Sequence, residues 1–257
     1  MSRVKMNLVY VVGTAGSGKS LFTASYAEWL RLKDVNVTTV NLDAAATTLP
    51  YEPDVDIREF FCVEELMEKY SLGPNGAIIM AADLIATEIE NIGEAIEEFR
   101  SDYVLIDTPG QMELFAFRVS GLYIVDELTS NPKAMIYLFD ATFSANPVNY
   151  VSNMFLATAI HTRFLLPQIY VLSKIDLIDP KAVKNILNWG LHLSSLEEAL
   201  EAEVSDTKRL MGRDVARLIS RLGLSFPLIP ISSTRMEGFI NLHTALTRIF
   251  SRGEEKT

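Results

Sequence analysis

The chain is poor in the residue types that form disulfides and transition-metal sites. Among 257 residues there is one cysteine, Cys62, and there are three histidines, at positions 161, 192 and 243. A single cysteine excludes an internal disulfide and suits a reducing compartment, so we expect a cytoplasmic protein. The histidines are too far apart to match the short ligand spacing that is typical of zinc sites. The sequence therefore predicts no transition-metal centre.

Long apolar runs and an excess of positive charge are also missing. No apolar run reaches the roughly eighteen residues that a membrane-spanning helix needs. The formal net charge is −10, whereas surfaces that bind nucleic acid are rich in Lys and Arg. We therefore expect neither a membrane span nor direct nucleic-acid binding. The apolar stretch near the start of the chain leads directly into a glycine-rich loop, so we interpret it as a core strand and not as a targeting segment.

Hydrophobic residues make up 49% of the chain and gather in short runs. Longer segments with helical spacing separate these runs. The runs are continuous and do not alternate with polar residues, as is typical of strands covered on both faces. The sequence predicts a doubly wound α/β fold, with a mostly parallel sheet flanked by helices. The predicted strands are 8–12, 35–42, 103–107, 134–140, 168–173 and 227–231.

The predicted strands and helices indicate one domain over residues 1–250. We expect a helical insertion at approximately 180–223, between the last two strands, because this acidic segment has an amphipathic pattern. Residues 251–257 are expected to form a frayed tail.

Residues 13–20 read GTAGSGKS and fit the P-loop pattern G-x-x-x-x-G-K-[ST] at each fixed position. The loop follows a predicted strand and precedes a predicted helix, as the pattern requires. In such a loop, backbone N–H groups and the helix N-terminus hold phosphate groups. Lys19 would reach the β- and γ-phosphates, and the Ser20 hydroxyl would bind Mg²⁺. The residues expected to bind the nucleotide phosphates are Gly13, Thr14, Ala15, Gly16, Ser17, Gly18, Lys19 and Ser20.

A second loop, DTPGQ at 107–111, follows the predicted strand 103–107. We expect Asp107 to hold Mg²⁺ through its water shell and the Gly110 N–H to contact a γ-phosphate. Gln111 is a candidate for orienting the attacking water. Pro and Gly are also the standard residues of ordinary turns, so the functional interpretation depends on the P-loop upstream.

The predicted strand 168–173 ends in SKID, which resembles the N/T-K-x-D guanine-recognition motif of GTPases. The Asp176 carboxylate can accept two hydrogen bonds from guanine, whereas adenine would face it with a lone pair. The stem of Lys174 can lie on the base. Ser173 replaces the usual Asn, which in GTPases ties this motif to the P-loop, so we expect modest nucleotide affinity. Ser232, in ISSTRMEGF, resembles a further guanine-contacting position, with a serine-rich loop as the alternative.

The tripeptide Gly73-Pro74-Asn75 lies in SLGPNG, between NLDAAATTLPYEPDVDIREFF and DTPGQMELF. Together these stretches resemble the GPN-loop GTPases, over about residues 7–245. This family belongs to the dimerising P-loop proteins related to signal-recognition GTPases and cell-division ATPases. A predicted strand between the P-loop and DTPG fits that class. Thr14 stands where the ATPase branch has an additional lysine, which argues against that branch.

The resemblance implies a Mg²⁺-dependent hydrolase that converts GTP to GDP and phosphate as a homodimer or a heterodimer. It implies that Gly73, Pro74 and Asn75 of one subunit enter the nucleotide site of the other. It also places Asp43, with Ser20 and Asp107, near Mg²⁺ or the attacking water, with the cap of a helix as the alternative for Asp43. For partners, it implies a client such as RNA polymerase or its assembly factors.

Three other interpretations remain open. The same P-loop would serve a nucleoside or polynucleotide kinase, which leaves SKID unexplained. A metal-insertion GTPase would need more Cys and His than this chain has. A nucleotide-gated binding module with incidental hydrolysis would share every motif. Arg58 and Arg118 are candidates for stabilising transition-state charge or for surface ion pairs.

Overall fold

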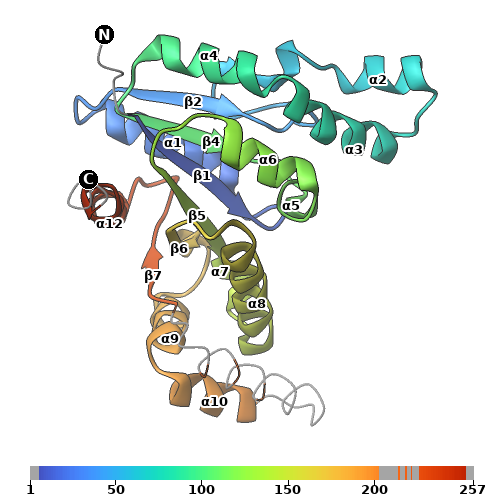
Figure 1. The fold of residues 1–257 in the computed structure, drawn as a ribbon. Coiled ribbons are helices and arrows are strands. Elements are labelled where there is room, and N and C mark those ends of the chain that lie inside the picture. Colours follow the sequence, from blue (N-terminus) through green and yellow to red (C-terminus); the bar gives the residue numbers. More distant parts are fainter. Residues whose placement is uncertain (1–5, 203–213, 215–217, 219–220, 222–225, 253–257) are drawn as a thin grey trace.

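The computed structural model describes residues 6–202, 214, 218, 221 and 226–252, and its centre is a seven-stranded sheet (Figure 1). The strand order is β3-β2-β4-β1-β5-β6-β7, and each neighbouring pair is parallel. The predicted α/β fold class is thus confirmed. The strands are β1 (Asn7–Gly13), β2 (Val37–Asn41), β3 (Val55–Asp56), β4 (Tyr103–Asp107), β5 (Lys133–Asp140), β6 (Gln168–Ser173) and β7 (Leu228–Pro230).

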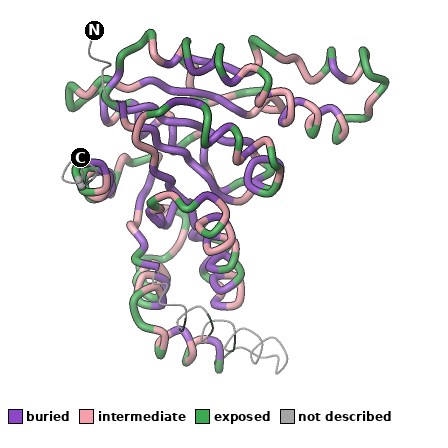
Figure 2. The backbone as a smooth tube through the Cα atoms, viewed as in Figure 1, coloured by how far each residue is buried: buried purple, intermediate pink, exposed green. Residues whose placement is uncertain are grey.

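Helices cover both faces of the sheet. Leu8, Tyr10 and Val12 of β1 belong to one buried apolar cluster, and the alternate residues Val9 and Val11 belong to a second. The second cluster includes residues of α1 and α12, and the first is closed by helices such as α4, α6 and α8. Figure 2 shows the resulting buried centre. The helices are α1 (Lys19–Arg31), η1 (Ile57–Glu59), α2 (Val63–Tyr70), α3 (Pro74–Leu84), η2 (Ile85–Thr87), α4 (Ile89–Phe99), α5 (Met112–Ala116), α6 (Val119–Glu127), α7 (Ala141–Ser144), α8 (Pro147–Phe164), η3 (Ile175–Leu177), α9 (Pro180–Leu191), α10 (Leu193–Glu201) and α12 (Phe239–Arg252).

Each of the six predicted strands is present. They could be predicted because a strand that is buried on both faces appears in the sequence as an unbroken apolar run. The edge strand β3 was not predicted. It spans only Val55–Asp56, which is too short for any periodic pattern to appear in the sequence.

Helices α9 and α10 lie between β6 and β7, within the predicted insertion. Most of the remainder of that insertion lies outside the described residues. Helix α12 runs to Arg252, beyond the predicted domain end at 250, and residues 253–257 of the predicted tail also lie outside the described part. In the part of the chain that the structure describes, no helix is long and apolar enough to cross a membrane.

The parallel sheet brings the carboxyl ends of its central strands to one edge. In β4, Asp107 is paired with Val11 of β1 and with Asn41 of β2. The last residues of β5 and β6, Asp140 and Ser173, are paired in the same way. The loops that follow these strands therefore converge, as is usual for ligand sites in open α/β sheets.

Candidate functional site

The P-loop connects β1 to α1, and its glycines are required by the backbone. Gly16 and Gly18 have φ values of 74° and 93°, in the left-handed region that favours glycine. A Cβ atom on Gly13 would lie 2.7 Å from Ser17 Oγ. Gly18 is also the N-cap of α1 and provides no side-chain cap, so the first N–H groups of the helix remain for an anion.

The Lys19 ammonium group lies between the P-loop and the DTPG loop. Its Nζ donates to the backbone oxygens of Gly13 at 3.0 Å, Thr14 at 3.2 Å and Gly110 at 3.4 Å. Burial lowers the pKa of Lys19, although the negative charges of Asp107 and Asp43 oppose this shift. The lysine therefore links two loops that are far apart in the sequence.

Asp107 is buried at the end of β4, beneath the loop that contains Tyr51. The Tyr51 hydroxyl donates to Asp107 Oδ2 at 3.2 Å. The other carboxylate oxygen, Oδ1, is buried and has no hydrogen-bond partner among the described residues. Burial raises the pKa of Asp107 to about 6, although Ser20, Lys19 and Tyr51 oppose the shift. A buried carboxylate oxygen that accepts no hydrogen bond suits a cation or its bound water.

Asp43 connects the end of β2 to the DTPG loop. Its Oδ2 accepts from the Gly110 N–H at 2.7 Å, and its Oδ1 accepts from the Ala45 N–H at 3.0 Å. The carboxylate therefore caps the turn after β2. The alternative of a helix cap is wrong, because no helix begins directly after Asp43 in the described part of the chain. The carboxylate also holds the backbone group that was predicted to meet a γ-phosphate.

An ion pair supports the loop that follows Asp43. Arg58 binds both carboxylate oxygens of Asp56, and its Nη1 donates to Ala46 O at 2.9 Å. Asn41 Nδ2 donates to Asp56 Oδ1 at 2.9 Å, and Asn41 Oδ1 accepts from the Asp43 N–H at 3.0 Å. Burial opposes ionisation of Asp56, but hydrogen bonds from Arg58 and Asn41 lower its pKa.

The second candidate arginine, Arg118, pairs with Asp83, and Arg118 Nε lies 2.8 Å from Asp83 Oδ1. Both candidate arginines, Arg58 and Arg118, therefore form ion pairs within this chain.

The segment SKID lies directly against the P-loop. Ser173 Oγ is 2.9 Å from the backbone oxygen of Ser17, so the serine forms the tie that usually comes from an Asn in this motif. Lys174 Nζ donates to Gly16 O and to Asp140 Oδ2, the latter at 2.7 Å. The Lys174 side chain thus crosses the P-loop next to Gly18, where an added Cβ atom would lie 3.5 Å from Lys174 Cε.

Asp176 and Ser232 meet at the far side of this edge. Thr234 Oγ1 lies 3.1 Å from Asp176 Oδ2 and 3.0 Å from Ser232 Oγ. Hydrogen bonds from Ser232 and Thr234 lower the pKa of Asp176, so this carboxylate stays ionised at neutral pH. Ser232 is buried at an isolated bridge to Glu237.

The residues Gly73, Pro74 and Asn75 are exposed at the turn between α2 and α3. Gly73 is the N-cap of α3 and Pro74 begins the helix, because its fixed φ suits the first helical position. Asn75 therefore lies in a helical first turn and not in an extended loop. In Figure 1 this turn is at the outer tip of the α2–α3 pair, well apart from the end of β1. Gln111 is likewise exposed, as the N-cap of α5.

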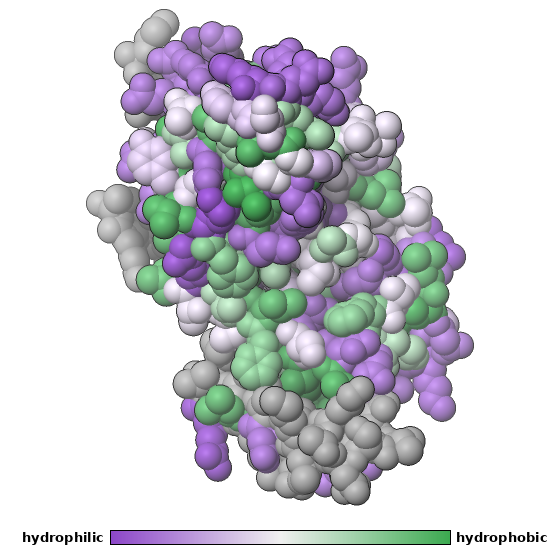
Figure 3. Space-filling model, turned by 90° about the vertical axis from the view of Figure 1, so that its right-hand side faces the viewer, coloured by the Kyte–Doolittle hydropathy of each residue, from purple (hydrophilic) through white to green (hydrophobic). Residues whose placement is uncertain are grey.

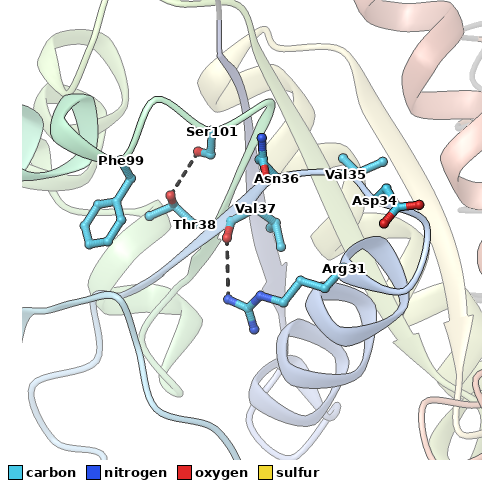
Figure 4. Close-up of a pocket in the computed structure, with 8 residues that line it drawn as sticks. All are labelled: Arg31, Asp34, Val35, Asn36, Val37, Thr38, Phe99 and Ser101. Atoms are coloured by element: carbon cyan, nitrogen blue, oxygen red, sulfur yellow. Dashed lines mark hydrogen bonds between the residues drawn. The ribbon is translucent and has the colours of Figure 1, made fainter.

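A separate depression lies at the opposite end of β2 (Figure 4). Arg31 Nη2 donates there to Val37 O at 3.4 Å, and Thr38 Oγ1 donates to Ser101 Oγ at 2.9 Å. None of the predicted site residues lines it. Its lining residues are Arg31, Asp34, Val35, Asn36, Val37, Thr38, Phe99 and Ser101.

Comparisons with known proteins agree with the motifs. A family described as "conserved hypothetical ATP binding protein" matches residues 11–252. The GPN-loop GTPase PAB0955 of Pyrococcus abyssi is 33% identical over 239 residues, which are 92% of this chain and 94% of that protein. The chain belongs to the GPN-loop GTPase family. The crystal structure of PAB0955, described as an apo form, matches this chain with a TM-score of 0.82 and 32% identity, covering 95% of this chain and 97% of that one.

Longer eukaryotic relatives match over part of their length. The GPN-loop GTPase 1 of Dictyostelium discoideum is 32% identical over 195 residues, which are 75% of this chain and 48% of that protein. The GPN-loop GTPase QQT2 of Arabidopsis thaliana is 33% identical over 238 residues, which are 89% of this chain and 61% of that protein. The chain thus spans about half to three-fifths of these two relatives. The family resemblance seen in the sequence is confirmed.

Several residues of the site were not predicted from the sequence, among them Asn41, Tyr51 and Asp140. Asn41 and Asp140 are the last residues of β2 and β5, so their position at strand ends was a usable signal. Tyr51 lies in the connection between β2 and β3, and its contact with Asp107 spans 56 positions. No local pattern indicates such a contact.

Proposed function

We propose that this GPN-loop GTPase binds GTP together with Mg²⁺ and hydrolyses it to GDP and phosphate. One observation carries the proposal: Ser173 Oγ bonds to Ser17 O, which joins the guanine-reading segment directly to the P-loop. Lys19 and Asp176 therefore lie on the same edge of the sheet and can act on the two ends of one nucleotide. A kinase would leave this second contact site without a purpose.

The oxygen atoms at this edge fit Mg²⁺. Asp107 supplies a buried carboxylate oxygen without a partner among the described residues, and Ser20 and Asp43 supply further oxygen atoms nearby. Hard oxygen ligands are those that Mg²⁺ prefers, usually with several waters retained. When bound, the ion would neutralise charge on the phosphate oxygens.

The Gly110 N–H gives the site a means to detect a γ-phosphate. It now donates to Asp43 Oδ2 at 2.7 Å. A γ-phosphate that accepted this N–H would displace the Asp43 carboxylate, which could then accept a proton or a hydrogen bond from the attacking water. Gln111 follows directly and would orient that water. Hydrolysis would reverse the exchange, so the DTPG loop would change with the state of the nucleotide.

The base contact favours guanine, although the matching family is described as ATP binding. Because Asp176 stays ionised, it can accept from guanine N1–H and the 2-amino group. Adenine offers a lone pair at N1 and would leave this charge unpaired. Such a loss costs about 2–3 kcal/mol, or roughly a hundredfold in affinity.

We propose that the Gly73-Pro74-Asn75 turn acts on a second subunit, as in a homodimer or a heterodimer. The turn is exposed and lies apart from the P-loop of its own chain (Figure 1). Exposed apolar residues accompany it on the neighbouring α3 and α6 and at the end of α5, and Figure 3 shows hydrophobic groups over the middle of this side of the molecule. These residues are Ile79, Phe117, Val119 and Tyr123. Apolar surface of this kind is common at subunit contacts.

The family resemblance extends the proposal to a cytoplasmic protein that assists the assembly of a large complex. RNA polymerase or its assembly factors would be the client. An alternative output is nucleotide-gated binding in which hydrolysis is incidental.

Mixing two inactive variants tests the shared site. Asn75→Ala removes the group supplied by the partner, and Gln111→Ala removes the group that orients water. Each mixed dimer would contain one site with both groups intact. In an equal mixture half of the dimers are mixed, and each of these has one complete site of two. GTP turnover should therefore reach up to about a quarter of the wild-type rate per subunit. Lys19→Ala mixed with Gln111→Ala is the control. Each of these variants disables the site of its own subunit, so no mixed dimer has a complete site and GTP turnover should not be restored. If subunit exchange is demonstrated and turnover is not restored, catalysis across the dimer is wrong.

A further inference from the structure

Asp140 occupies a position at the site that the motifs did not indicate. It is the last residue of β5 and is paired in register with Ser173, the last residue of β6. Lys174 follows Ser173 with a φ of 59°, in the left-handed region. From this position, the Lys174 side chain runs back over the P-loop, next to Gly18.

The two oxygens of the Asp140 carboxylate have different partners. Oδ1 accepts from the Thr142 N–H at 2.8 Å and from the Thr142 hydroxyl at 2.6 Å, and so caps α7. Oδ2 lies 2.7 Å from Lys174 Nζ. Because the cap fixes one end of the carboxylate, the other end is a fixed anchor for the lysine.

The anchored lysine crosses the loop beside the proposed base position. Its Nζ also donates to Gly16 O, and its Cε lies close to Gly18. A free lysine side chain has many rotamers, and ordering it on binding reduces affinity. A lysine that is already held across the P-loop offers its aliphatic stem to a base at little entropic cost.

We propose that Asp140 is a positioning residue for nucleotide binding, which holds Lys174 across the P-loop so that its stem forms the surface for the guanine base. This inference rests on the proposed binding of guanine nucleotides. Asp140 itself touches no nucleotide group in this account. Its negative charge repels an anionic ligand, so a pure charge effect and a positioning effect have opposite signs.

The test is GDP affinity measured by calorimetry for Asp140→Ser. Serine keeps the capping function but is too short to reach Lys174. If the anchor matters, GDP binding should weaken roughly tenfold. If Asp140 acts only through its charge, GDP should bind more tightly. Equal or tighter binding than in the wild type overturns the inference.

Asp179→Ser is the matched control. Asp179 also caps a helix, α9, and accepts from the Lys181 N–H at 2.7 Å. This variant removes the same charge and keeps a serine cap, so it should bind GDP within twofold of the wild type. If Asp179→Ser also lowers GDP affinity tenfold, then removing the charge of any capping aspartate weakens binding, and the specific role of Asp140 is overturned.

Steady-state kinetics and a double variant separate positioning from a general structural effect. In Asp140→Ser, KM for GTP should rise with the loss of affinity while kcat stays within about twofold. In a Lys174→Met background, Asp140→Ser should not weaken GDP binding further, because Asp140 acts on the nucleotide only through Lys174. An equal tenfold loss in both backgrounds overturns the inference.

Folding and binding controls keep the result interpretable. If Asp140→Ser does not fold, Asp140→Asn takes its place. Asparagine keeps the helix cap and is long enough to reach Lys174, but it lacks the charge. Asp140→Asn should lower GDP affinity by a smaller factor, and an unchanged GDP affinity overturns the inference. A wild-type protein that does not bind GDP would contradict the proposed function itself. Wild-type binding with an unaffected Asp140→Ser would contradict the role of Asp140 alone.

Discussion

Ser173 Oγ lies 2.9 Å from the backbone oxygen of Ser17, and this bond joins the end of β6 to the P-loop. The same hydroxyl is 3.2 Å from Phe139 O of β5. A serine has one hydroxyl hydrogen, so it shares a single donor between these two carbonyl groups. The structure therefore keeps the link between the SKID segment and the P-loop although the usual asparagine is absent.

Ser173→Ala should weaken GDP binding about tenfold and lower the free energy of unfolding by about 1–2 kcal/mol, because a buried hydrogen bond is lost. Calorimetry and urea denaturation measure the two effects. Ser101→Ala is the control, since Ser101 Oγ accepts from Thr38 Oγ1 at 2.9 Å in a buried position at the opposite end of β2. It should lower stability while GDP affinity stays unchanged. Unchanged GDP affinity in Ser173→Ala would contradict the role given to this bond.

Asp176→Asn should shift the preference from guanine toward xanthine nucleotides. Asparagine presents an amide donor that can meet the 2-oxo group of xanthine, whereas it pairs poorly with the 2-amino group of guanine. We expect the GTP/XTP selectivity to change by at least a hundredfold, as judged from kcat/KM with each nucleotide. Asp179→Asn, three positions away, should leave the selectivity unchanged. Wild-type selectivity in Asp176→Asn would exclude this carboxylate from base recognition.

Asp107 should make the nucleotide-free protein less stable as pH rises. Its folded-state pKa is raised to about 6 by burial, whereas an unfolded Asp titrates near its ordinary value. The stabilisation is therefore fully present below about pH 4 and is lost as pH rises through about 6. The loss amounts to about 2–3 kcal/mol.

Asp107→Asn isolates this effect, because the amide does not titrate. From pH 4 to pH 7.5, the free energy of unfolding of the wild type should fall by about 2–3 kcal/mol relative to that of Asp107→Asn. The measurement uses urea denaturation without nucleotide or Mg²⁺. A difference that is constant with pH would show that Asp107 titrates normally in the folded protein.

The fold, and the meeting of the P-loop with the DTPG and SKID segments at one sheet edge, could be predicted from the sequence because the relevant patterns are local. The apolar runs of β1 and β4 and the fixed positions around Lys19 each lie within a few residues. Parallel strand order then brings their ends together without further information.

Long-range contacts could not be predicted. The Tyr51–Asp107 and Asp140–Lys174 hydrogen bonds join residues 56 and 34 positions apart. Their chemistry depends on which loops fold over the sheet edge, and the sequence pattern does not specify this. Pro74 is a different case. A proline at the first helical position favours the start of a helix, and the start of α3 at this residue was not predicted from the sequence.

The most direct test of the account is the rate of GTP hydrolysis per subunit as a function of protein concentration, with ATP as the competing substrate and Asn75→Ala beside the wild type. The account predicts turnover that is selective for GTP, rises as subunits associate and falls at least tenfold in Asn75→Ala, since positioned polar groups typically contribute that much to phosphoryl transfer. Turnover that is independent of concentration and unaffected by Asn75→Ala would contradict it, and the Gly73-Pro74-Asn75 turn would then have only a structural role.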